Sequence, residues 1–136
     1  MSGDAMVSLA DFVREHGVRM SVRRTDGNPL MDNARDMDHW RCVLTCEGRR
    51  MVLTFSMGFG LNGVAPGVMD VLDCLASDAT ALDMPFEEWC REYGYDLDSR
   101  KALRTYRACV RHGTALRRVL GSQAVFDALR YDVERL

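Results

Sequence analysis

The sequence predicts an α+β fold, in which an N-terminal short helix and a small antiparallel sheet of about three strands pack with a C-terminal half of about four helices. Apolar and polar residues alternate over residues 18–23 and again over 39–57, with the two-residue period of half-buried strands. After Pro66 the apolar spacing changes to three or four residues, which is the period of a helix. A length of 136 residues fits one domain, mainly β over 1–58 and helical over 67–136.

Composition places the expected single domain, residues 1–136, among reduced proteins of the cytoplasm. The apolar fraction of 47% is ordinary, and a formal net charge of −2 by itself points neither to a nucleic acid nor to a membrane. Five irregularly spaced cysteines argue against a disulfide framework. No leader is recognisable, and no apolar run approaches the roughly 18 residues of a membrane span. We therefore expect a cytoplasmic protein with no membrane partner.

The pattern over residues 39–57 predicts a hairpin in a defined register. With a two-residue turn at Glu47-Gly48, Cys46 opposes Arg49 and Trp40 opposes Phe55. A slip of one residue would mix the apolar and polar sets, so the pattern itself selects the register. The expected apolar face consists of Trp40, Cys42, Leu44, Cys46, Met51, Leu53 and Phe55. The expected polar face consists of Arg41, Val43, Thr45, Arg50, Val52 and Thr54.

Capping residues predict where the helices begin and end. Ser8 and Asp11 form a capping pattern before a short helix that Gly17 ends. We expect a strand at 18–23 to join the hairpin. The helical half is expected to hold one helix after Pro66, a second from Phe86 to about Tyr93, a third from Ser99 to about Leu120, and a last one after Ser122.

The segment Gly58–Gly63 matches the G-x-G-x-x-G pattern of dinucleotide-binding loops. Such a site needs a parallel strand–helix–strand unit, whereas the strand before Gly58 belongs to a hairpin and no later strand is evident. We therefore interpret the segment as a glycine-rich connector and expect no cofactor.

The candidate metal and catalytic residues do not have the spacing that such sites require. Cys42 and Cys46 lie four positions apart on one strand, about 13 Å, whereas zinc binds sulfur at about 2.3 Å. Cys109 and His112 are three apart on a helix but offer only two ligands. The three histidines show no Ser or Cys partner in a nucleophile pattern. The acidic stretch lacks the spacing of a calcium loop; it contains Asp32, Asp36 and Asp38. We expect no catalytic residue, no metal site and no enzyme.

Charge is strongly divided along the helical half. Residues 67–98 hold nine acidic residues and one base, Arg91, whereas residues 99–118 hold seven bases and no acid. At about 100° per residue, five arginines fall within a stripe about 60° wide and about 27 Å long. This arginine stripe consists of Arg100, Arg104, Arg107, Arg111 and Arg118.

Aligned like charges repel one another unless something compensates them. One interpretation is internal, with the acidic segment packed beside the stripe. Another is external, with the stripe facing phosphates or an acidic protein surface. In the mirror case the acidic segment faces a basic partner. Charge counts do not choose among these.

Four segments resemble a family of small proteins encoded by bacteriophages and mobile elements. They are FSMG at 55–58, VLDCLASDA at 71–79, FEEWCREYGYD at 86–96 and DSRKA at 98–102. The likeness covers about residues 38–130. The family has no established activity, so the resemblance implies no catalytic residue. It implies a phage setting, in which small non-enzymatic proteins, anti-CRISPR proteins among them, often bind host machinery.

Two functional hypotheses follow. The first is a phage-type inhibitory binding protein in the host cytoplasm, a candidate anti-CRISPR protein that blocks a host protein or CRISPR effector complex. The second is a nucleic-acid-binding accessory protein that uses the stripe. Besides the stripe, Tyr93 and Tyr95 are candidate contact residues, because aromatics are enriched at interface anchors. Trp89 is expected to pack in the core between its helix and the next. The oligomeric state stays open.

Overall fold

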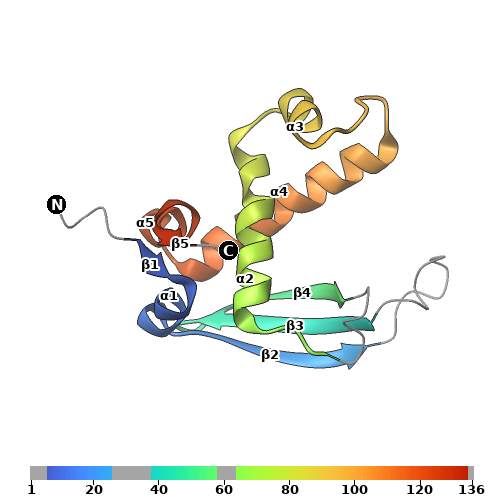
Figure 1. Ribbon diagram of the computed structural model, residues 1–136. Helices are drawn as coiled ribbons and strands as arrows, with labels where there is room; N and C mark the ends of the chain where they lie inside the picture. Colours follow the sequence, from blue (N-terminus) through green and yellow to red (C-terminus); the bar gives the residue numbers. More distant parts are fainter. Residues whose placement is uncertain (1–5, 26–37, 58–63, 135–136) are drawn as a thin grey trace.

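The computed structural model describes residues 6–25, 38–57 and 64–134, and it confirms the α+β class. The main sheet has three strands. In Figure 1 it lies at the base, and the helices rise from one side of it. The elements, in chain order, are β1 Val7–Ser8, α1 Leu9–His16, β2 Val18–Thr25, β3 Asp38–Cys46, β4 Arg49–Met57, α2 Val68–Asp78, the 3-10 helix η2 Ala79–Asp83, α3 Phe86–Tyr93, α4 Arg100–Leu120, α5 Gln123–Asp127, the π-helical turn η3 Ala128–Asp132 and β5 Val133–Glu134.

The sheet has the order β2-β3-β4 and is antiparallel throughout. Glu47 and Gly48 both have positive φ, 49° and 84°, as a tight two-residue turn between twisted strands requires. Cys46 therefore pairs with Arg49, and Trp40 with Phe55, which confirms the register that the alternation predicts.

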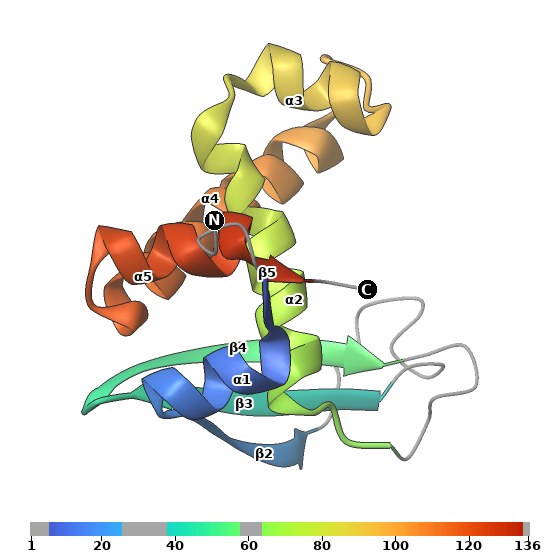
Figure 2. The same ribbon diagram turned by 60° about the vertical axis from the view of Figure 1, so that its left-hand side comes forward.

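The apolar face of this sheet carries the main core. Helices α1, α2, α4 and α5 lie on that side in both views (Figures 1 and 2). Leu44, Leu72 and Leu116 are fully buried, and they come from the sheet, α2 and α4 respectively. The opposite face of the sheet is covered by none of the described helices (Figure 2).

A second, smaller hydrophobic cluster lies away from the sheet, between η2, α3 and the N-terminal half of α4. Trp89 is its centre and is only 4% exposed. Its ring stacks on Tyr95 at 4.9 Å between centroids and meets Tyr106 edge-on at 5.4 Å. The core interpretation of Trp89 is therefore confirmed.

Helix α4 belongs to both clusters, and it crosses η2 at Gly113. A Cβ at this position would lie 2.9 Å from both Ala79 Cα and Leu82 Cδ1. The absence of a side chain therefore sets how closely the two elements approach.

Some features were not expected from the sequence. β1 pairs in parallel with β5, Val7 opposite Val133, and α5 ends in the π-helical turn. A strand of two residues is too short to show an alternation of apolar and polar residues. Its pairing joins two segments that are far apart in the sequence. The glycine-rich segment Gly58–Gly63 and the acidic residues Asp32 and Asp36 lie outside the described residues.

Candidate functional site

Helix α4 has well-defined ends that its own sequence supplies. The Ser99 side chain accepts a hydrogen bond from Ala102 N at 3.1 Å, and Gly121 closes the helix with a φ of 88°. Arg117 and Arg118 occupy the last turn, where cations favour the negative end of the helix dipole. The helix therefore spans 21 residues without interruption and presents a long, straight face.

All five arginines of the stripe are exposed on this face. Within the described ranges, none of them makes an ion pair with a carboxylate. Two carboxylates of the acidic segment are paired with other residues: Asp78 bonds His112, and Asp83 bonds Arg130. Internal pairing, which charge counting left open, is therefore not what the structure shows for the stripe.

The acidic segment is exposed as well. On α3 and the loop after it, Glu87, Glu88, Glu92, Asp96 and Asp98 all face solvent. The arginine stripe and these five carboxylates thus lie on neighbouring elements, and both sets are exposed to solvent.

At its C-terminal end the stripe meets a pocket of about 470 Å³. Three arginines line it, Arg49, Arg117 and Arg118, together with Ser122 and Gln123. No acidic residue lines this pocket. Arg49 is already bonded to Glu47 and to two carbonyls of α4, so a phosphate or carboxylate group in this pocket would meet the guanidinium groups of Arg117 and Arg118.

The two candidate tyrosines lie on another side of α4. Tyr93 is 48% exposed, and its hydroxyl lies 2.9 Å from Thr80 Oγ1, whereas Tyr95 is half-buried against Trp89. With Thr105 they line a pocket of about 310 Å³. Thr105 points about 140° from the axis of the stripe, so the structure does not join tyrosines and arginines in one surface.

Cys109 and His112 gain a third neighbour that the sequence spacing could not reveal, because it comes from α2. Asp78 Oδ2 lies 2.9 Å from His112 Nδ1. Burial, followed by the Asp78 carboxylate, raises the pKa of Cys109 to about 11, and burial with Asp78 and Asp73 raises the pKa of Cys74 to about 11. Such thiols are protonated at neutral pH and are poor nucleophiles.

The two cysteines considered as zinc ligands on the strand, Cys42 and Cys46, serve as core residues. Cys42 and Cys46 are buried in the main core, and the Cys46 thiol donates to the His16 carbonyl at 3.2 Å. In the part of the chain that the structure describes, no three His, Cys, Asp or Glu side chains are grouped so that they could hold a metal ion.

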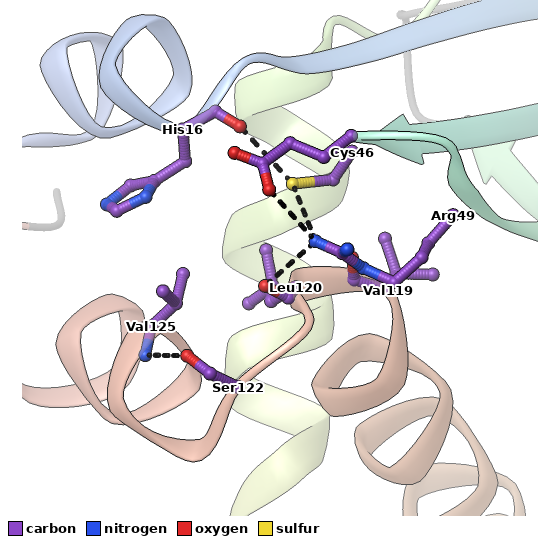
Figure 3. Close-up of polar contacts among 8 residues, drawn as sticks. His16, Cys46, Arg49, Val119, Leu120, Ser122 and Val125 are labelled. Atoms are coloured by element: carbon purple, nitrogen blue, oxygen red, sulfur yellow. Dashed lines mark hydrogen bonds and ion pairs between the residues drawn. The ribbon is translucent and has the colours of Figure 1, made fainter.

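Arg49 ties α4 to the sheet. Hairpin register places Arg49 opposite Cys46, but no local pattern indicates this second role. Its Nε donates to the Val119 carbonyl at 2.8 Å, and its terminal nitrogen donates to the Leu120 carbonyl at 3.3 Å (Figure 3). Both carbonyls belong to the last turn of α4, where no further turn supplies donors.

Comparison with known proteins yields no match to a family model, to a curated protein or to a solved structure. None of the described helices is both long and apolar enough to span a membrane. What this chain binds is therefore inferred from its own surfaces.

Replacing Arg49 with Ala should lower the free energy of unfolding by about 2 to 3 kcal/mol, because charge-assisted hydrogen bonds to two helix carbonyls are lost. Urea unfolding measures this loss. Arg50→Ala is the matched control, since Arg50 is exposed on the opposite face of the sheet, and its effect should stay within about 0.5 kcal/mol. Equal stability of the two variants would contradict the anchoring role.

Changing Asp78 to Asn should speed alkylation of Cys74. A pKa of about 11 in place of the ordinary 9.0 leaves about 100-fold less thiolate at neutral pH, and Asp78 is one cause of that rise. The alkylation rate should rise with pH towards 11 in the wild type and reach the same rate at lower pH in the variant. Iodoacetamide labelling followed by mass spectrometry measures both profiles, with Glu88→Gln as control. Superimposable profiles would rule out this influence of Asp78.

Proposed function

We propose that this protein is a non-enzymatic nucleic-acid-binding protein whose arginine stripe on α4 contacts the phosphate backbone. One observation carries the proposal: five exposed arginines lie in line on a single helix, and none is paired with a described carboxylate. Neighbouring like charges on a helix each cost a few tenths of a kcal/mol. A polyanion along the stripe would remove that cost, and the guanidinium group suits phosphate geometry.

The dimensions suit a nucleic acid. The stripe runs about 27 Å along a rigid helix, which corresponds to about eight base pairs of a duplex at 3.4 Å each. The arginine-lined pocket at Gly121 extends the row beyond Arg118. Contact with about five phosphates predicts a slope of roughly −4.5 for the logarithm of affinity against the logarithm of salt.

Reversing the charge of Arg104, Arg107 and Arg111 to Glu should weaken binding to a 20-base-pair duplex by at least about 100-fold at 50 mM salt, and should flatten the salt slope by about 3. Fluorescence anisotropy over 50 to 200 mM salt measures both quantities.

A matched control carries three charge reversals at bases that do not belong to the stripe, Arg14, Arg91 and Lys101, all of which are exposed. The control changes net charge by the same amount and should keep most of the affinity. No binding by the wild type at 50 mM salt, or equal losses in the two variants, would contradict the proposal.

A second candidate function is the phage-type inhibitory protein, an anti-CRISPR protein that blocks a host effector complex. The exposed acidic residues of α3 favour it, because they lie beside the half-exposed Tyr93 and complement a basic, nucleic-acid-binding protein surface. The resemblance to phage-encoded proteins supports the same setting.

Expressing the protein in bacteria that carry different CRISPR systems should restore phage growth in at least one of them. The variant Glu87→Lys, Glu88→Lys, Glu92→Lys should lose this protection, whereas the stripe reversal at Arg104, Arg107 and Arg111 should keep it. Plaque counts measure the effect. Failure to protect phage against every system would exclude this second function.

A further inference from the structure

The face of the sheet that points away from the helices is strongly basic. None of the described helices covers it (Figures 1 and 2), and strand alternation places four arginines on it: Arg19, Arg23, Arg41 and Arg50. All four are exposed. The other described positions of this face hold Ser, Thr, Val and His39, and none of them is acidic.

Strand pairing sets the arrangement of these side chains. Arg23 lies directly opposite Arg41, whereas Arg19 and Arg50 flank Thr45 from either side. With strands about 4.8 Å apart and a rise of about 3.3 Å per residue, the four form a patch about 10 Å by 13 Å. Its two ends are Arg19 with Arg50, and Arg23 with Arg41.

This arrangement is unfavourable for the isolated fold. Like charges directly opposite on neighbouring strands destabilise a sheet, and Arg23 and Arg41 form such a pair. Across the described ranges none of the four arginines forms an ion pair. Each side chain is exposed, so core packing does not call for a cation at any of these positions.

We propose that this basic sheet face is a second nucleic-acid contact surface, which binds the phosphate backbone of a double helix. This face would bind the same class of ligand as the arginine stripe. The inference rests on the proposed function only in taking a nucleic acid as that ligand. The long dimension of the patch, about 13 Å, matches the width of about 12 Å of a duplex major groove, so its two ends can reach phosphates on both sides.

The other residues of this face indicate which kind of partner it would bind. Sheets that bind single strands stack bases on exposed aromatic rings, but Trp40 and Phe55 lie on the core side, and His39, the one ring at a described position of this face, is only partly exposed. A second copy of the chain is disfavoured, because two such faces repel each other. Contacts to phosphates alone carry no sequence information, so binding should be independent of sequence.

The test uses a variant with Arg23→Gln, Arg41→Gln and Arg50→Gln, alone and combined with the stripe reversal. Affinity for a 20-base-pair duplex should fall at least about tenfold, and the salt slope should flatten by roughly 2 to 3. The combined variant should lose the residual binding that the stripe reversal retains. The control, Arg14→Gln, Arg91→Gln and Lys101→Gln, removes the same charge elsewhere.

Thermal unfolding separates a binding role from a structural one. The single variant Arg41→Gln should keep or raise the midpoint of unfolding, because it removes a like-charge pair, while it weakens binding. A lower midpoint would mean that Arg41 serves the fold, and would overturn the inference.

The outcomes also distinguish the two proposals. If the sheet variant binds the duplex as tightly as the wild type, with the same slope, the inference fails and the stripe proposal stands. If only the sheet variant loses affinity, the stripe proposal fails and the inference stands. Tighter binding to a single strand than to the duplex, or an effect of the sheet variant on anionic lipid vesicles alone, would also overturn the inference.

Discussion

Two hydrogen bonds from the Arg49 guanidinium to the C-terminus of α4 tie the sheet to the helix that carries the arginine stripe. The first residue of β4 reaches across to carbonyls some seventy positions later in the chain. Position 121 requires a glycine for two reasons: its φ is positive, and a Cβ there would collide with the Arg49 guanidinium. The hairpin and the longest helix are thereby held at a fixed orientation, which also turns the apolar side of α4 towards the core.

The rotation of α4 about its axis follows from this anchoring and from its own apolar side. Ala102, Leu116 and Leu120 are buried, and they lie roughly opposite the arginines on the helical wheel. Burying them leaves the stripe no direction other than solvent. Because α4 also packs against Trp89 and its neighbours near the other end, both halves of the helix that carries the stripe are packed against other elements.

Local patterns in the sequence were enough for most of the fold but not for the interfaces. The alternation around Glu47-Gly48 predicts the hairpin register, and Ser99 and Gly121 predict the ends of α4, because each depends on neighbours in the chain. The partner of Arg49 and the contact between Asp78 and His112 could not be predicted, since they join residues distant in sequence. The same holds for the sheet face: alternation shows that Arg41 and Arg50 are polar-side residues, but only the packing of the helices shows that nothing described covers them.

The net charge of −2 conceals a division between the acidic residues of 67–98 and the basic residues of 99–118. For binding, this division matters more than the total charge. At physiological salt the field of a surface charge is screened within about 8 Å, so a polyanion responds to the patch beneath it and not to the whole molecule. Exposed carboxylates then mark one end of the basic surface. They belong to α3 and to the loop after it, which holds Asp96 and Asp98. They lie next to the N-terminal end of α4, where Arg100 begins the stripe, and they would repel a phosphate backbone that extended past that end. Under the proposed function, the acidic segment would limit how a nucleic acid lies along α4, and the C-terminal end of the stripe, near Arg118, would be the open direction.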